Sequence, residues 1–587
     1  MIRGAVQDHQ VALAYIAGPS WSGYVISTVW PRGEDAIRLT YSPLSRLMTT
    51  FFAMDDVAFP PPQPGARRVA EVLLIVLVFF TVAGDPPPHV NEAHYLTRLK
   101  QYWNPEWCAG DLFLESADTQ LLLIWLFGWV TKWLSLPATA WVGRVLTWTL
   151  LAWAWQRLSW RLVPVPLVAM LSAALFVTLN AVGHLAGEWI VGGVEAKCFA
   201  YVFVLLALRE LADGRWNRLW LLLGAAAAFH PLVGGWSVVV CAAIWLVDAR
   251  RHVNLFSMGP GLAGGLLLGL VGVLPALSLT WNESDAVVAE ANRIYVFDRL
   301  PHHLALLSLP SDEVVRRFAR HALLLVVLAA LGYWLRRLAE PVAPLRRVIL
   351  FAWGAVLLAV GGVAIELVLS HDRLVASGLL RYYWYRLTDF AAPMAVSLTA
   401  TALLATGMTQ QKKWATWALL GALVLAGWHI TSVARSRWAN PVPPADEKMD
   451  DFTMWVKACD WAAENTPPKA VFLTPRLNHS FKWRTGRAEV VTRKDIPQDV
   501  RSIVEWHRRL KDVFYYEDSE DLANPVGSLS HLGTERVREL AIKYGANYVL
   551  TERDQLLSLP RVYPTREHPN DEYVIYRIDE HERADGE

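Results

Sequence analysis

The sequence predicts a mainly α-helical protein, a polytopic transmembrane bundle of about 11 to 13 spans followed by a soluble α/β domain. Hydrophobic residues make up 54% of the 587 residues, and 29 are tryptophan. Many apolar runs approach the length that crosses a bilayer, which makes the lipid bilayer the first expected partner. The net charge of +1 disfavours nucleic acid as a partner. The sequence carries no signal for an oligomeric state.

Residues 1–66 are expected to be a poorly ordered N-terminal extension, because they lack a signal-peptide pattern and end in a proline-rich stretch. Met48 or Met54 would serve equally well as the start of translation. Arg67 and Arg68 precede the first apolar run. By the positive-inside rule the N-terminus is then cytoplasmic, and the loop at 85–119 is external.

This first external loop is the densest polar insertion between two apolar segments. The prolines at 86–88 stop the preceding helix, and Asn91 is a good N-cap for a new one. Apolar residues at helical spacing predict an amphipathic surface helix over 92–103. Five acidic residues indicate a site at the membrane surface. They are Asp85, Glu92, Asp111, Glu115 and Asp118.

The transmembrane domain is expected to span 67–432. Clusters of Arg and Lys between its apolar segments fit cytoplasmic turns if the loop at 281–320 is external. The count of crossings then reaches the acidic loop with one too many. One segment within 121–182 must therefore be re-entrant, interfacial or split into two short helices. The same count places the C-terminal tail outside the cell membrane.

Charged residues beside apolar segments need a reason, because a charge at the bilayer centre costs about 2.5 to 3.5 kcal/mol. The loop 184–197 carries Glu188, Glu195 and Lys197. Two interpretations stay open: an ion pair of Glu195 and Lys197 at a helix end, or a second acidic wall of an external cavity that binds substrate. His230, which precedes Pro231, either ends a helix or contacts a ligand.

No metal site is assigned, although a divalent metal remains an option and the cofactor is unknown. The adjacent pair His302 and His303 is weak evidence for a metal. Cys108 and Cys459 are the two cysteines in polar regions, so a disulfide between them is an open alternative.

The stretch RYYWYR, from Arg381 to Arg386, precedes a late apolar run. Arginine donates two parallel hydrogen bonds to phosphate, which would make Arg381 and Arg386 binding residues. Alternatively, the stretch is an aromatic belt in the headgroup zone with snorkelling arginines.

The tail at 440–587 is expected to be an external soluble α/β domain. Periodicity predicts helices at 450–464, 499–515 and 535–544, strands at 470–474, 488–492 and 547–552, and a hairpin at 561–577. The tail contains no glycine-rich phosphate loop. Its expected task is to cap or recognise a molecule at the outer membrane face.

Together these features resemble the GT-C superfamily of membrane glycosyltransferases. The stretches that carry the resemblance are GDPPPHVNEAHYL at 84–96, RYYWYRLTDFAAPM at 381–394 and WAAENTPPKAVFLTP at 461–475. The resemblance implies transfer of a sugar from a polyprenyl-phosphate carrier to an envelope acceptor at the outer membrane face.

It also implies that an acid in the first external loop acts as base or metal ligand. Many relatives have an Asp-Glu pair where this chain has Asn91 and Glu92, which leaves Glu92 or Asp111 as the catalytic candidate. A transporter or flippase, and a non-catalytic envelope scaffold, remain the alternative functions.

Overall fold

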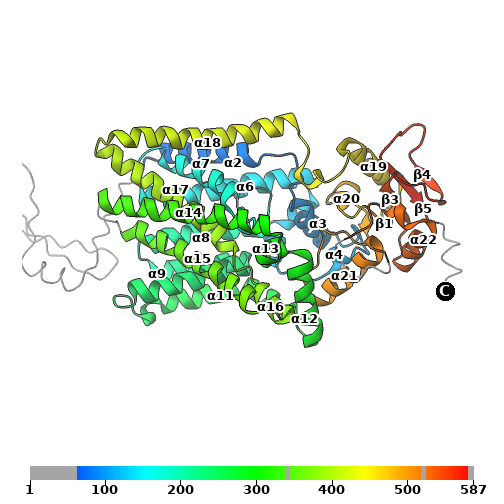
Figure 1. The fold of residues 1–587 in the computed structure, drawn as a ribbon, viewed down its shortest axis with the longest axis horizontal. Coiled ribbons are helices and arrows are strands. Elements are labelled where there is room, and N and C mark those ends of the chain that lie inside the picture. The colour runs from blue at the N-terminus through cyan, green and yellow to red at the C-terminus, as the bar shows by residue number, and fades with distance from the viewer. Residues whose placement is uncertain (1–62, 339–342, 517–523, 579–587) are drawn as a thin grey trace, which may run out of the picture. The chain divides into compact units, whose positions relative to one another are not determined.

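The computed structural model describes residues 63–338, 343–516 and 524–578. The expected N-terminal extension therefore lies outside the described residues, apart from its last four. Residues 59–587 group into one compact unit. That unit contains both the long helices and the C-terminal sheet (Figure 1).

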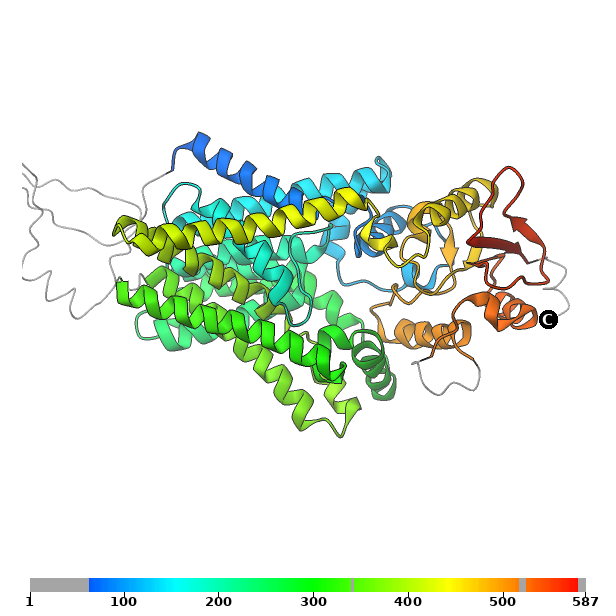
Figure 2. The same ribbon diagram turned by 45° about the horizontal axis from the view of Figure 1, so that its top comes forward.

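Long helices make up the larger part of the chain and lie side by side (Figure 1). They are α2 Gly65–Ala83, α6 Leu136–Leu162, α7 Val168–Gly183, α8 Ala196–Ala212, α9 Trp216–Phe229, α10 Pro231–Ile244, α11 Gly259–Ser278, α14 Ser311–Leu338, α15 Ala343–Val368, α17 Arg386–Thr409 and α18 Lys413–Ala439. Figure 2 shows α18 running beside α2, which it contacts.

By length and composition, 6 helical segments among the described residues could cross a membrane. They are 231–249, 255–278, 311–338, 343–368, 386–409 and 413–439. The chain is thus a multi-pass membrane protein, and the expected fold class is confirmed. The sequence-based figure of 11 to 13 spans also counted helices that are shorter or more polar; several of these, such as α7, α8 and α9, pack within the same bundle.

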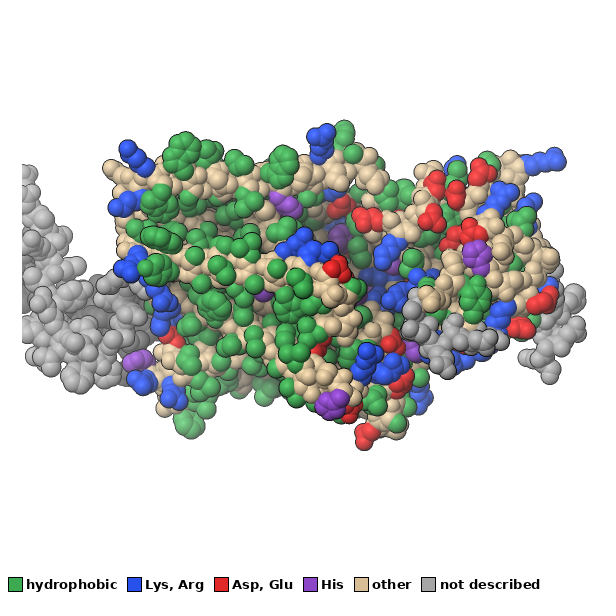
Figure 3. All heavy atoms as spheres, in the orientation of Figure 1, with side chains coloured by type: hydrophobic (Ala, Val, Ile, Leu, Met, Phe, Trp, Pro, Cys, Tyr) green, Lys and Arg blue, Asp and Glu red, His purple; other side chains and the backbone are tan. Residues whose placement is uncertain are grey.

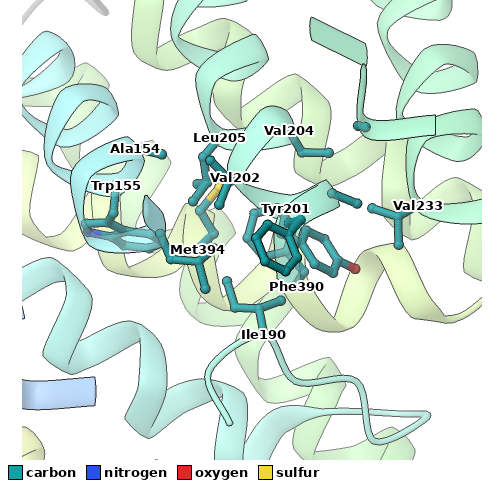
Figure 4. Close-up of a cluster of buried hydrophobic side chains, with 14 of the residues drawn as sticks. Ala154, Trp155, Ile190, Tyr201, Val202, Val204, Leu205, Val233, Phe390 and Met394 are labelled. Carbon is teal, nitrogen blue, oxygen red and sulfur yellow. The ribbon is translucent and has the colours of Figure 1, made fainter. Parts of the chain in front are cut away.

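The helix α17 lies at the centre of this bundle, because 83% of its most apolar window is buried, against 6% for α18. Tyr201 of α8 and Phe390 of α17 pack with ring centroids 4.6 Å apart. Trp155 and Met394 lie in the same apolar cluster (Figure 4). The exposed apolar side chains of α18 are those expected of a helix that faces lipid.

Glycines bring α9 and α11 into close contact. A Cβ atom on Gly224 would lie 2.1 Å from the carbonyl oxygen of Gly265, and one on Gly265 would lie 2.3 Å from that of Trp220. Only glycine permits backbones to approach this closely, as at many helix interfaces in membranes.

The first polar loop folds differently from the expected surface helix. Helix α3, Glu92–Trp103, buries Leu96, Thr97 and Leu99 against neighbouring elements, including α6 and the short helix α20 of the sheet region. The amphipathic pattern was therefore a sign of packing between protein layers, and it was wrong to place this helix at the lipid surface. A short helix, α4 Leu112–Glu115, follows.

The apolar run at residues 121–136 does not form one continuous helix. This apolar run forms two short helices, α5 Leu121–Leu126 and the 3-10 turn η1 Gly128–Lys132. The Trp103 indole nitrogen donates to the carbonyl of Ile124 at 2.9 Å and ties α5 to α3. The run is thus split into two short pieces, as one of the three alternatives expected, and its place relative to the membrane stays a prediction.

Short elements connect the later long helices. They are η2 Trp245–Ala249, η3 Leu255–Met258, α12 Asp285–Arg293, η4 Ile294–Arg299, α13 Pro301–Leu304, η5 Leu306–Ser308, α16 Arg373–Leu380 and η6 Pro444–Asp446. The segment 285–308 lies next to the sheet region: Ala291 and Ile294 share an apolar cluster with Leu473 and Trp506.

The sheet region contains all the helices and strands predicted for the tail. Its strands pair in the order β2-β1-β3-β5-β4. β1 pairs parallel with β2 and β3, and β5 pairs antiparallel with β3 and β4, so the hairpin is confirmed. The elements are α19 Phe452–Asn465, β1 Val471–Leu473, α20 Phe481–Thr485, β2 Ala488–Glu489, α21 Val500–Phe514, η7 Leu529–Leu532, α22 Thr534–Lys543, β3 Tyr548–Glu552, β4 Arg561–Tyr563 and β5 Tyr573–Arg577.

Candidate functional site

A cavity of about 690 Å³ lies where the start of α3, the loop before α8, the segment after α12 and the sheet region meet. Figure 3 shows apolar side chains over the helical part and charged side chains gathered at its junction with the sheet region. The basic residues that line the cavity are Lys197, Arg299, Arg317, Arg386, Lys448, Arg493 and Lys494. The acidic ones are Glu188, Glu195, Glu313 and Glu447.

The structure brings together the charged residues predicted in the loop 184–197. The Lys197 ammonium lies 3.5 Å from Glu188 Oε2 and 3.3 Å from Glu195 Oε2. All three side chains are at most 5% exposed and line the cavity. The ion pair of Glu195 and Lys197 is therefore present, and its residues line a cavity; that this cavity is external and binds substrate stays a prediction.

Arg386 reaches the same wall from the first turn of α17. Its Nε lies 3.1 Å from Glu188 Oε2, and its guanidinium carbon lies 3.9 Å from the centre of the Tyr383 ring. The remaining Nη1 donates to His230 Nε2 at 3.1 Å. The backbone nitrogen of Val233 approaches the other ring nitrogen, Nδ1, at 3.4 Å, so His230 also caps α10. His230 is behind the cavity wall and orients Arg386.

Arg381 is not among the cavity-lining residues. Its Nη1 donates to Asn292 Oδ1 at 2.5 Å, which joins the end of α16 to α12. Of the two arginines in the RYYWYR stretch, only Arg386 is placed to meet a ligand there. Four residues that belong to neither α16 nor α17 separate the two arginines, so no helix places them on one face.

Glu92 has surroundings that differ from those of an accessible base. Its carboxylate is fully buried and accepts from Arg144 Nε at 2.7 Å. The backbone nitrogens of His89 and Val194 donate to it at 2.8 and 3.0 Å. Burial alone would raise the pKa of Glu92, but Arg144 outweighs burial and holds the pKa below its usual value. Glu92 thus fastens α3 to α6 and does not line the cavity.

Asp111 is likewise buried outside the cavity. It caps α4 by accepting from Leu114 N at 3.1 Å, and it accepts from Glu489 N at 3.0 Å. The Lys482 ammonium lies 3.2 Å from Asp111 and contacts two further carboxylates, those of Glu489 and Asp495. Although burial favours the neutral amine, these carboxylates hold the pKa of Lys482 well above its usual value. Asp111 therefore joins the acidic loop to the sheet region.

Asn91 lines the cavity and bonds to both of its sides. Its side-chain nitrogen donates to Glu195 Oε1 at 2.7 Å, and its oxygen accepts from Lys494 Nζ at 2.6 Å. The amide thus bridges the helical part and the sheet region. Sequence reasoning missed Lys494, Lys448, Arg493 and Arg299, because no local pattern distinguishes them from other basic residues in polar segments.

Among the described residues, no group of three or more His, Cys, Asp or Glu side chains is arranged to hold an ion. His303 Nδ1 already bonds the carbonyl of Ala186, and the oxygen of Asn91 already holds an ammonium. Cys108 and Cys459 are free thiols buried in separate apolar clusters, so the disulfide alternative was wrong.

Known proteins resemble this chain in one short segment of sequence and, more broadly, in structure. Residues 453–513 match the family model of a domain of unknown function, DUF6798. No curated protein matches the sequence. Two solved structures show limited similarity to this chain. They are an Archaeoglobus fulgidus oligosaccharyltransferase complex with Zn and sulfate, and ArnT from Cupriavidus metallidurans bound to undecaprenyl phosphate.

The oligosaccharyltransferase is 13% identical with a TM-score of 0.39, covering 82% of this chain and 67% of that one. ArnT is 12% identical with a TM-score of 0.36, covering 86% of this chain and 97% of that one. At these TM-scores neither likeness assigns a role to any residue of this chain.

Proposed function

We propose that this protein is a membrane glycosyltransferase that moves a sugar from a polyprenyl-phosphate carrier to an envelope acceptor at the outer membrane face. The observation that carries the proposal is the cavity, which combines seven basic and four acidic side chains with tyrosines at the junction of a membrane bundle and a polar region. In this proposal, 67–432 is the transmembrane domain and 440–587 the external domain.

The basic lining suits the donor. When the glycosidic bond to the carrier breaks, negative charge develops on the departing phosphate, and preorganised cations stabilise it. The aromatic side chains of Tyr95, Tyr295 and Tyr383 line the same space and offer apolar faces and hydroxyls to a sugar. A carrier with a long apolar chain also explains why such a polar cavity belongs to a membrane protein.

The acidic lining suits the acceptor. Glu188 Oε2 is shared by Lys197 and Arg386, whereas the Oε1 atom forms no ion pair among the described residues. A carboxylate in the wall of the cavity is able to take the proton of an attacking hydroxyl that binds beside it. We therefore assign the base role to Glu188, in place of Glu92 and Asp111, and Glu195 orients Asn91.

The test is a profile of lipid-linked sugars in cells that lack this protein. The proposal predicts that a polyprenyl-phosphate-linked sugar accumulates, that the wild-type gene restores the profile and that Glu188→Gln does not. A flippase would instead change the side of the membrane on which the carrier lies, with transfer to the acceptor retained in detergent extracts. A profile that does not change on deletion would contradict the proposal.

A further inference from the structure

We infer that Lys448, Arg493 and Lys494, the sheet-side cation triad, form the subsite for the phosphate group of the substrate. The inference rests on the proposed function, since it assumes that a phosphate-bearing molecule enters this cavity. It gives the C-terminal region a direct part in substrate binding, where the sequence had pointed to Arg381 and Arg386.

Three of the four basic residues on the helical side of the cavity are paired with carboxylates, and the fourth, Arg299, donates to two backbone carbonyls. Arg386 and Lys197 share Glu188, and Lys197 also contacts Glu195. Arg317 donates to Glu313 at 2.6 Å. A phosphate that approached these cations would have to compete with carboxylates held at ion-pair distance. Their positive charge is therefore largely unavailable to a ligand.

The triad differs in this respect. Within the ranges 63–338, 343–516 and 524–578, none of its three side chains forms an ion pair with a carboxylate. Lys494 donates only to the neutral amide of Asn91. The neighbouring Asp495 is bound instead by Lys482 at 2.7 Å and His94 at 3.0 Å. Three cations without a counter-ion in one cavity are a site for an anion.

The helical part holds this subsite in place. Arg299, at the end of η4, donates through Nε to the carbonyl of Arg493 at 2.8 Å and through Nη2 to that of Lys494 at 3.2 Å. The two bonds fix the backbone from which the side chains of Arg493 and Lys494 extend. A subsite fixed before binding loses less conformational freedom when the ligand arrives.

The electrostatics of the cavity agree with this geometry. Burial and the charge of Arg299 together lower the pKa of Lys494 to about 7, against the opposing effect of Glu195 and Asp495. Burial and the charges of Arg299 and Arg493 also lower the pKa of Lys448. A bound phosphate would relieve this repulsion, so binding and protonation of Lys494 favour each other.

A pH dependence follows from Lys494. Its side chain is an ammonium below about pH 7 and a neutral amine above it, so phosphate binding weakens as the pH rises through this value. The cavity histidines do not change charge there, because burial lowers the pKa of His302 to about 4, that of His479 to about 3, and those of His94 and His303 below the usual value. The ligand contributes little to this pH dependence, because a phosphate monoester is already mostly dianionic above about pH 6.

The experiment measures the binding of farnesyl phosphate, farnesol and inorganic phosphate to the purified full-length protein in detergent, from about pH 6.5 to about 9. The variants are the double substitution Lys448→Gln and Arg493→Gln, and the single substitution Lys494→Arg. The charge-matched controls are Lys469→Gln and Arg501→Gln, whose side chains are 75% and 79% exposed. Thermal unfolding verifies that each variant folds.

The wild type should bind farnesyl phosphate more tightly than farnesol, and the double variant should lose about tenfold or more in affinity, as expected when charge-assisted hydrogen bonds are removed. Lys494→Arg should bind at pH 9 as well as at pH 6.5, which a merely structural lysine would not produce. Competition by inorganic phosphate at similar concentrations would show that the triad binds the phosphate group alone; weak competition would show that the lipid contributes.

Two failures are distinguishable. If the wild type binds farnesyl phosphate no better than farnesol, the proposed function is wrong. If the wild type prefers farnesyl phosphate but the double variant matches the two controls, the triad is not the subsite, and the proposed function stands with Arg386 as the phosphate ligand.

Discussion

Glu92 and Arg144 form a buried ion pair whose loss affects folding before it affects chemistry. Removing one partner of such a pair costs about 3 to 5 kcal/mol, because the other charge stays buried without compensation. Glu92→Gln should therefore lower the unfolding temperature in detergent well below that of a control, Glu535→Gln, whose side chain is 80% exposed. A variant with wild-type thermal stability and no transfer activity would instead restore Glu92 as a catalytic residue.

Glu188 is the residue on which the chemistry is expected to depend. A general base contributes typically about 10² to 10⁴-fold in rate, so Glu188→Gln should reduce transfer by this factor while Glu535→Gln has no effect. The affinity for farnesyl phosphate should remain measurable, because the triad is unchanged. Transfer at the wild-type rate in the Glu188→Gln variant would contradict the assignment of the base.

At the level of elements, the contact between α9 and α11 depends on glycine. Gly224→Ala places a methyl group 2.1 Å from the carbonyl of Gly265, so the two helices must separate, and overpacking of this kind costs about 1 to 3 kcal/mol. Gly421→Ala on α18 is the matched control, since no atom lies within 4 Å of its added methyl group. Thermal unfolding should show a loss for the first variant only, and equal loss for both would contradict the packing.

Elements that depend on local pattern could be predicted from the sequence, whereas their surroundings could not. Apolar spacing along 499–515 predicted α21, whose Ile503, Trp506 and Leu510 are buried. The same kind of pattern along 92–103 predicted α3 correctly as a helix. It could not reveal that protein covers both its faces, because amphipathic spacing does not distinguish lipid from a second layer of protein.

The candidate site was predictable only in part for the same reason. Glu188, Glu195, Lys197 and Arg386 were noticed because charges beside apolar segments need a partner. Lys494 lies in a polar segment where a lysine is ordinary, and its importance comes from Asn91, about four hundred positions earlier in the chain. Arg144 did carry a signal, since it lies within an apolar run and so required a buried partner such as Glu92.

For the whole molecule, the orientation of the sheet region is a prediction that labelling can test. Cys459 is buried, as are the other three cysteines, so an introduced cysteine is needed. Lys457→Cys on the exposed side of α19 should react with a membrane-impermeant maleimide in intact cells. Arg251→Cys, in the exposed turn between α10 and α11, should react only after the membrane is opened. The reverse pattern would overturn the topology and the external site.

The central claim is that a phosphate-bearing lipid binds in the cavity at the junction of the helical part and the sheet region. The most direct test is to photo-crosslink the full-length protein with farnesyl phosphate that carries a diazirine and to map the labelled peptides by mass spectrometry. The account predicts labelled peptides within 187–197, 295–303 and 477–498, with labelling suppressed by excess unlabelled farnesyl phosphate. Labelling confined to the lipid-facing helices, or to the region of Arg381, would contradict it.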